Sequence, residues 1–530
     1  MTEHTENKPQ KKKNLLKSGM IVSASTLLSR ILGLVRDVII ANLLGASLAA
    51  DVFFFANRIP NFFRRLFADG AFNQAFVPVL AEYSAKDHRT CRDFISMVTG
   101  TLGAVISLVT IIGVFGSSVV AAVFGWGWYV DSLNSDTGAE KFALASLLLK
   151  ITFPYLWFVT ITAIFGAVLN SNKKFAVPAL SPCLLNISTI SCALLLSPHL
   201  EQPAVGLAIG IFLGGLAQLL FQLPFIINLK LLGLPKFNWN HEGIVKIRTL
   251  MLPAIFGISV DQINILVSTT IASFLATGAI SYLYYSERIL EFPLGMFAIA
   301  ISTVILPSLS RGAVSSDTAK FTRTMDWGVR MVLLLGIPAM FGIIVLRELI
   351  IATIFMHGEF STGDVVKSSA SLFACTLGLL SFMLVKVFAP GFYARQDTKS
   401  PVKYAAVAVL SNIFFNLALV FPFDYIGLAL STAISGTINM LLLARGLHRK
   451  NIYQISRDTC NFALKLFISA TAMAAAITLL LPEVEYIADL SIEMRALWLA
   501  GLISLGAAVY FTTGLICGIR KADLRVNEEL

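Results

Sequence analysis

The sequence predicts an all-α, polytopic membrane protein with fourteen transmembrane helices. Apolar runs of about 20 residues, the length needed to cross a bilayer, recur along nearly the whole chain. Hydrophobic residues make up 56% of the 530 residues and charged residues only 14%, against about 25% charged in soluble domains. A long internal repeat further predicts two six-helix lobes, related by a pseudo-twofold axis along the membrane normal, plus two C-terminal helices.

Each predicted span is a mainly apolar stretch bounded by polar or charged residues. The first continues too far to be the apolar region of a cleavable signal peptide, and no small-residue cleavage site ends it early. The predicted spans cover residues 15–43, 49–68, 94–124, 142–169, 177–197, 204–229, 249–275, 280–306, 327–355, 368–394, 402–422, 426–446, 460–481 and 494–518.

Loop charges predict the orientation of these spans. The loops on one side are rich in lysine and arginine, as in Lys173 and Lys174, whereas those on the other are acidic or uncharged, as at Asp131 and Glu201. Basic loops mark the cytoplasmic side of a membrane protein. We therefore expect a multi-pass membrane protein with both termini in the cytoplasm. The net charge of +10 then indicates a basic cytoplasmic rim, and no nucleic-acid partner is expected.

The internal repeat has a period of roughly 225–230 residues. AADVFFFANRIPNF (49–62) is similar to AISYLYYSERILEF (279–292), which aligns Arg58 with Arg288, and Pro78 falls opposite Pro307. Six spans per copy is an even number, so both copies have the same topology. We expect a disordered cytoplasmic tail (1–13), an N-lobe (14–235), a C-lobe (236–450), and a final segment (451–530) with the last two helices and a cytoplasmic C-terminus.

Charged and amide side chains inside apolar spans are the candidate functional residues. A charge near the middle of a bilayer costs roughly 2.5–3.5 kcal/mol on insertion scales, so such residues line a protein interior or a wet pathway. A guanidinium group binds paired oxygens and stays charged, which suits a phosphate or pyrophosphate. The predicted substrate-binding residues are Arg30, Arg36, Asn61, Arg64, Ser281 and Arg288, and the predicted supporting or gating acids are Asp37, Asp51 and Glu291.

Structural ion pairs are the alternative role for these charged groups. Arg58 is a candidate partner of Asp51, and Arg65 is a candidate for extension to the cytoplasmic surface. Neither arginine is therefore assigned to the substrate.

Four further polar residues lie inside predicted spans: Asp261, Lys386, Asn412 and Asn416. A carboxylate with amide oxygens could hold a coupling cation, while hydrogen bonding between helices is the commoner role of such groups. The six cysteines are scattered, and no cluster has the spacing of a metal site. We expect no cofactor, no metal and no catalytic residue, with the membrane potential or a monovalent cation as candidate energy sources.

Several stretches resemble the MurJ/MviN lipid II flippases of the MOP exporter superfamily. They are NLLKS (14–18), SRILGLVRD (29–37), DVFFFANRIPNFFRRLFADGAFNQAFVPVLAEY (51–83), LLKITFPY (148–155), YYSERILEFPLG (284–295) and KVFAPGFYARQDTKSPVK (386–403). The resemblance implies a non-enzymatic transporter that moves undecaprenyl-pyrophosphate-linked peptidoglycan precursor, lipid II, to the periplasmic leaflet. Cell-wall synthesis proteins are implied as partners.

The resemblance also assigns residues. The family's functional arginines fall on Arg30, Arg36, Arg64 and Arg288, its supporting acids on Asp37, Asp51 and Glu291, and a basic position of its tenth span on Lys386. The expected mechanism is alternating access, in which two lobes rock about a central polar cavity.

Three other functions stay open. A drug or cation antiporter, or an O-antigen-type flippase, would share the superfamily, although a cationic-drug exporter favours an acid-dominated cavity. A membrane glycosyltransferase or ligase needs an exposed acidic metal motif or a catalytic loop domain. A membrane scaffold for the cell-wall machinery does not need arginines inside its spans.

Overall fold

The computed structural model describes residues 8–66, 71–314 and 317–520, with all their side chains except those of residues 8–19, 71, 253–254, 256–261 and 313–314. All the regular elements in these ranges are helices, so the chain is an all-helical, multi-pass membrane protein, as its sequence predicts. The count of fourteen spans stays a prediction. Ten described segments are long and apolar enough to cross a bilayer: His88–Phe115, Asp136–Ser171, Ala176–His199, Pro203–Asn228, Ala279–Gly312, Thr318–Phe355, Thr362–Tyr393, Lys399–Arg449, Arg457–Thr478 and Ile492–Ile516.

The chain divides into two compact units, Met1–Phe274 (unit 1) and Leu275–Leu530 (unit 2). Unit 1 includes the helix over Glu242–Ala272, whereas the repeat assigns residues from 236 onward to the second lobe. The lobe boundaries drawn from the repeat stay a prediction.

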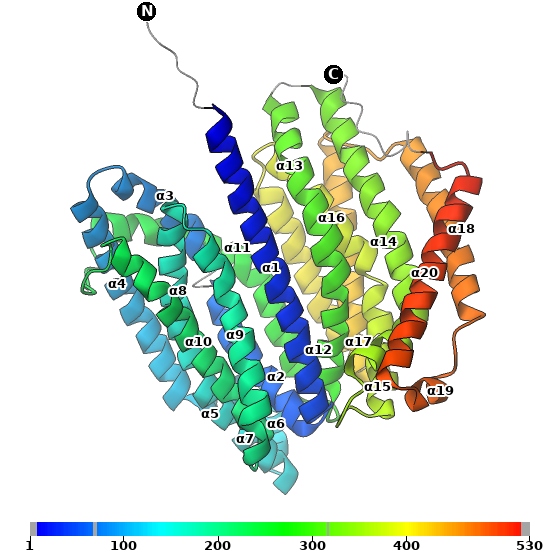
Figure 1. Ribbon diagram of the computed structural model, residues 1–530, viewed down its shortest axis with the longest axis horizontal. Helices are drawn as coiled ribbons and strands as arrows, with labels where there is room; N and C mark the ends of the chain where they lie inside the picture. Colours follow the sequence, from blue (N-terminus) through cyan, green and yellow to red (C-terminus); the bar gives the residue numbers. More distant parts are fainter. Residues whose placement is uncertain (1–7, 67–70, 315–316, 521–530) are drawn as a thin grey trace, which may run out of the picture. The chain divides into compact units, whose positions relative to one another are not determined.

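Unit 1 is coloured blue to green in Figure 1, and α8, α9 and α10 run side by side in it, with α1 against α9. Helix α1 begins at Lys8, inside the segment predicted to be a tail, and residues 1–7 lie outside the described residues. The helices of unit 1 are α1 (Lys8–Leu44), α2 (Leu48–Arg64), α3 (Ala71–Ser84), α4 (His88–Phe115), α5 (Ser117–Phe124), α6 (Trp126–Ser132), α7 (Asp136–Thr152), α8 (Pro154–Ser171), α9 (Ala176–Leu195), the 3₁₀ turn η2 (Ser197–His199), α10 (Pro203–Asn228) and α11 (Glu242–Ala272).

Aromatic side chains fill one part of the core of unit 1. Phe72, Phe76 and Phe94 are fully buried among apolar residues of α3, α4, α8, α10 and α11. The Phe72 and Phe76 rings stack with centroids 4.8 Å apart, and Tyr83 stacks on Phe94 at 4.1 Å. Offset stacking adds about 0.5–1.5 kcal/mol to the free energy gained from burying such rings. This packing fixes α11 against α3.

Helix α2 shows how the sequence sets one of the site-bearing elements. The Ser47 hydroxyl accepts a hydrogen bond from the Ala50 amide and caps the helix, and Asp51 in the first turn interacts favourably with the positive end of the helix dipole. Pro60 lies inside the helix, where it removes one intrahelical donor. The corresponding repeat element, α12, likewise contains a proline, Pro293.

Unit 2 is coloured green to red in Figure 1, and α14, α18 and α20 contact one another in it. Its helices are α12 (Ala279–Pro293), the π-helix η3 (Leu294–Ala298), α13 (Ile299–Val314), α14 (Thr318–Phe355), α15 (Thr362–Thr376), α16 (Leu379–Tyr393), α17 (Lys399–Arg449), α18 (Arg457–Thr478), α19 (Val484–Asp489) and α20 (Ile492–Ile516).

The long element α17 consists of two helices joined at a kink. Asp424 has φ 53° and ψ −138°, outside the helical region. It lies between the predicted spans 402–422 and 426–446. Gly427 follows the kink, and a Cβ there would collide with the carbonyl oxygen of Leu419, so the two halves of α17 need a glycine where they meet.

Candidate functional site

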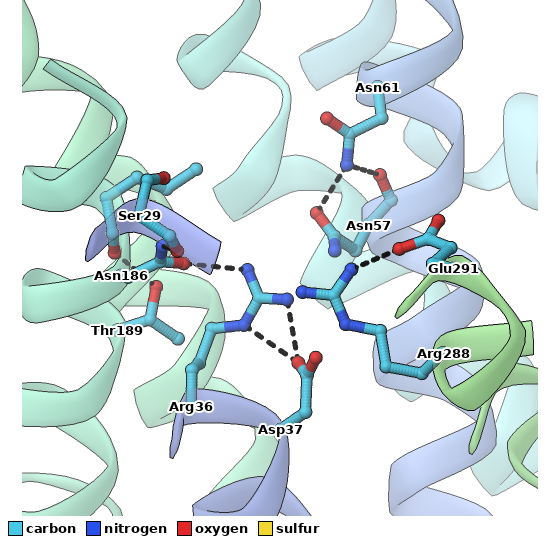
Figure 2. A network of polar contacts seen from close by, with 10 residues as sticks. Ser29, Arg36, Asp37, Asn57, Asn61, Asn186, Thr189, Arg288 and Glu291 are labelled. Atoms are coloured by element: carbon cyan, nitrogen blue, oxygen red, sulfur yellow. Dashed lines mark hydrogen bonds and ion pairs between the residues drawn. The ribbon is translucent and has the colours of Figure 1, made fainter. Parts of the chain in front are cut away.

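Arg36 of α1, one of the predicted substrate-binding residues, is bound by side chains of its own helix and of α9 (Figure 2). Its Nε and Nη2 donate to Oδ1 of Asp37 at 3.0 and 2.7 Å, and its Nη1 donates to Oδ1 of Asn186 in α9 at 3.2 Å. The Asp37 side chain is fully buried, whereas 17% of the Arg36 side chain is exposed. A buried carboxylate thus holds the guanidinium group of a side chain that is partly exposed.

Asn186 fixes this arrangement from a neighbouring helix. Its Nδ2 donates to the backbone carbonyl of Ser29 in α1 at 3.1 Å while its oxygen accepts from Arg36. One buried amide therefore binds both the backbone and the guanidinium group of α1. Sequence reasoning missed Asn186, because a single amide in the apolar span 177–197 resembles any helix-packing residue. Its only signal was its polarity inside that span.

Arg30 lies two turns before Asp37 on α1, and its environment differs from that of Arg36. The Arg30 side chain is exposed, and among the described residues it has no side-chain hydrogen bond or ion pair. The two predicted substrate-binding arginines of α1 therefore differ, because only Arg36 is held in place by neighbouring side chains.

On α2, three of the polar residues form a hydrogen-bonded row. Arg64 Nε donates to Oδ1 of Asn61 at 3.0 Å, and Nδ2 of Asn61 donates to Oδ1 of Asn57 at 2.9 Å. All three side chains are half-buried. The row orients the Arg64 guanidinium group along the helix, and Figure 2 shows its two asparagines.

Two other arginines, Arg58 of α2 and Arg65 at its C-cap, contact α11 within unit 1. Arg58 Nη1 donates to the Thr269 hydroxyl at 3.0 Å, and Arg65 Nη1 donates to Oε1 of Gln262 at 3.3 Å. Asp51, at the start of α2, is buried. Arg58 and Arg65 therefore join two helices of unit 1. The pairing of Arg58 with Asp51 and the extension of Arg65 to the cytoplasmic surface stay predictions.

In unit 2, Arg288 of α12 donates from Nη1 to Oε2 of Glu291 at 2.6 Å (Figure 2). The exposed fractions of the two side chains are 25% and 61%. Ser281, seven residues earlier on α12, is fully buried. The pair is an i,i+3 bridge at a partly exposed position, so Glu291 orients the guanidinium group without enclosing it.

The remaining predicted polar residues have other surroundings. Lys386 of α16 is exposed. Asn412 and Asn416 are fully buried, with Asn416 Nδ2 donating to Asn412 Oδ1 at 2.8 Å and Asn412 Nδ2 donating to the Ser435 hydroxyl at 3.2 Å. The bond to Ser435 joins the two halves of α17. The side chain of Asp261 lies outside the described residues.

Arg495, which sequence reasoning did not single out, is a buried cation at the start of α20. Its Nε and Nη2 donate to the carbonyls of Ile487 and Ala488 at 2.9 and 2.8 Å, and its Nη1 donates to those of Met356 and Ala352 at 3.0 and 3.4 Å. Arg495 therefore ties α20 to α19 and to the end of α14. Its place at the edge of a predicted span made it look like a loop residue.

Within the described residues, no three histidine, cysteine or acidic side chains are grouped as a metal site would require. The arrangement instead offers guanidinium groups held by carboxylates and amides. Such groups bind oxyanions.

A family model described as "Lipid II flippase MurJ" matches residues 40–490. A relative named "Probable lipid II flippase MurJ" from Vibrio cholerae serotype O1 is 56% identical over 518 residues, covering 98% of this chain and 99% of the relative. A second of the same name, from Haemophilus influenzae, is 56% identical over 506 residues, covering 94% and 99%.

Among solved structures, one titled "Lipid II flippase MurJ, inward closed conformation" is 30% identical, with a TM-score of 0.76, and covers 94% of this chain and 98% of its own. An inward-facing multidrug resistance transporter of the MATE family, in the MOP superfamily, has a TM-score of 0.64 at 12% identity, covering 82% and 98%. This second likeness concerns the fold alone.

Proposed function

Because this chain belongs to the MurJ family of lipid II flippases, we propose that it moves lipid II from the cytoplasmic to the periplasmic leaflet of the bacterial inner membrane. The proposed substrate is the undecaprenyl-pyrophosphate-linked peptidoglycan precursor. The family is one of transporters, so the work of the protein is to bind and release this lipid without changing its covalent structure.

The observation that carries the proposal is the Arg36 group. Its guanidinium is held by a buried carboxylate and a buried amide, and part of the side chain stays exposed. Holding the group in place lowers the entropy lost when it binds an anion. A guanidinium presents paired N–H donors to paired oxygens, the geometry that a pyrophosphate offers.

We propose that Arg30, Arg64 and Arg288 contact the same pyrophosphate during transport, with Asn61 and Ser281 nearby. The acids Asp37, Asp51 and Glu291 would compete with the substrate for these arginines and so promote release. The ion pairs Arg36–Asp37 and Arg288–Glu291 support this role for two of the acids.

Alternating access is the proposed mechanism, and the division of the chain into two compact units supports it. We place both termini in the cytoplasm, because the basic loops lie on their side of the membrane. The membrane potential is the proposed energy source, at about 2.3 kcal/mol per elementary charge per 100 mV. A monovalent cation, with Asn412 and Asn416 as candidate ligands, is the other candidate energy source.

The test is complementation in a bacterium depleted of its own lipid II flippase. Wild-type chain should restore growth, and Arg36→Ala and Arg288→Ala should not, at equal amounts in the membrane. Arg449→Ala is the matched control, because Arg449 is exposed and has no side-chain partner among the described residues. Equal rescue by all the variants would contradict the assignment of the arginines.

A second measurement separates this function from other transport. Purified protein in proteoliposomes should move labelled lipid II between leaflets and should leave a cationic dye where it is. Export of the dye without movement of lipid II would identify an antiporter, and rescue of growth without either movement would identify a scaffold.

A further inference from the structure

A cavity in unit 2 lies at the basic end of α17 and includes none of the arginine groups described above. Its volume is about 390 Å³, and its lining includes Phe388 of α16, Arg445 and His448 of α17, and Tyr453, Gln454 and Ile455 of the connection to α18. It therefore combines two basic side chains with two aromatic rings.

The two basic residues have no internal anion within the part of the chain that the structure describes. Both side chains are exposed, and neither Arg445 nor His448 makes a side-chain hydrogen bond or ion pair with a described residue. The neighbouring Lys450 differs, because its Nζ donates to Asp397 and to the Ser400 hydroxyl. Arg445 thus offers a full set of guanidinium donors to a ligand from outside.

The wall formed by Tyr453 is fixed by buried bonds. The Tyr453 side chain is 5% exposed, and its hydroxyl donates to Oδ1 of Asp326 at 2.6 Å. The Thr459 hydroxyl donates to the same oxygen at 3.3 Å and accepts from Nε of Arg330 at 2.9 Å. Asp326 is therefore engaged in this network and is not part of the cavity lining. The cavity has a rigid aromatic side before any ligand binds.

Exposed apolar residues flank the cavity, Leu441 on α17 and Ile455 at the rim. Leu441, Arg445 and His448 are spaced i, i+4 and i+7, so they share one face of the helix. Leu441 is 57% exposed, and Ile455 at the rim is 41% exposed. A ligand with an anionic head and an apolar tail matches this order of cationic cavity and exposed apolar surface.

We propose that this cavity binds the phosphate of an anionic glycerophospholipid, with the acyl chains lying along Leu441. The phosphate oxygens accept hydrogen bonds from Arg445 and His448, and the ring of Tyr453 closes the side of the site. The proposal is independent of lipid II transport, because it uses none of the arginines assigned to that substrate.

The test measures retention of phosphatidylglycerol by the purified full chain, using native mass spectrometry from detergent. The double variant Arg445→Gln, His448→Gln should lower the affinity roughly tenfold or more, as expected for the loss of charge-assisted hydrogen bonds. Arg449→Gln should leave it unchanged. An equal loss in Arg449→Gln would mean general surface attraction and would overturn the site.

Two further arms separate a lipid from free phosphate as the source of the anion. Leu441→Gln should weaken binding of phosphatidylglycerol, and inorganic phosphate should bind far more weakly than the lipid. If inorganic phosphate bound with the same affinity as the lipid, the lipid assignment would be overturned. Unchanged thermal unfolding of the variants is the check on folding.

Discussion

Asn186 and Arg36 show how one amide can hold a charged side chain in an apolar helix. Asn186 accepts from Arg36 and donates to the Ser29 carbonyl at the same time. The charge of Arg36 is visible in the sequence, but its partner is 150 residues away, and spacing along the chain cannot reveal such a contact.

Asn186→Leu should slow lipid II movement in proteoliposomes several-fold, because Arg36 loses one of the groups that hold it. Arg36→Lys should slow it further, since an ammonium group cannot bind Asp37 and Asn186 in the same planar geometry. Asn228→Leu, which replaces an exposed amide at the end of α10, is the control. A full rate in folded Asn186→Leu protein would contradict the positioning role.

Asp397 gives a pH-dependent prediction outside the spans. Hydrogen bonds from Lys450 and Ser400 lower the pKa of Asp397 from 3.8 to about 2. A carboxyl with a lowered pKa stabilises the fold above its ordinary pKa, and this stabilisation is lost as the pH falls from about 4 to about 2. Asp397→Asn should therefore unfold at a lower temperature than wild type at pH 6, and the two should converge near pH 2.

Thermal unfolding in detergent at a series of pH values checks this. Glu359→Gln changes an exposed carboxyl with no side-chain partner among the described residues, so it should match wild type throughout. A constant difference between Asp397→Asn and wild type down to pH 2 would refute the assignment.

At the scale of elements, α20 depends on Arg495. Four backbone carbonyls accept from its guanidinium group, and the side chain is 6% exposed. A carbonyl left without a partner in a buried position costs about 1–3 kcal/mol. Arg495→Met should therefore lower the unfolding temperature in detergent by several degrees, and Arg495→Lys should restore only part of the loss.

Glu493→Gln, an exposed substitution in the first turn of the same helix, is the control for Arg495. If Arg495→Met unfolded at the wild-type temperature, α20 would be held by its apolar contacts alone.

The kink of α17 gives a second prediction for an element. Gly427→Ala should destabilise the protein by roughly 1–3 kcal/mol, because the added methyl group meets the backbone of Leu419. Gly342→Ala in α14 is the matched control, since a Cβ there has nothing within 4 Å. The measurement is the unfolding temperature of each variant. Equal unfolding temperatures for Gly427→Ala and Gly342→Ala would contradict the close approach of Gly427 to the Leu419 backbone.

For the whole molecule, hydropathy predicted the all-helical membrane fold, because apolar runs of spanning length need no tertiary information. It also separated the two halves of α17, since Asp424 interrupts their apolar pattern. The partners of Arg58 and Arg495 in the folded chain could not be predicted in this way. Their acceptors include a threonine hydroxyl and backbone carbonyls, groups that occur throughout any helical chain.

The proposed orientation can be tested with membrane-impermeant thiol reagents on intact cells. Glu485→Cys should react with the reagent in intact cells, and Lys173→Cys should react only after the cells are permeabilised. The reverse pattern would invert the topology. A cysteine-free background is needed for both, because the chain has six cysteines of its own.

The ion pair between Arg36 and Asp37 has an electrical consequence. The pair has no net charge, so a transmembrane field exerts almost no net force on it as α1 moves. The same holds for Arg288 and Glu291. Voltage would then act on the bound diphosphate and on charges outside these two pairs, such as Arg30, which has no ion pair among the described residues.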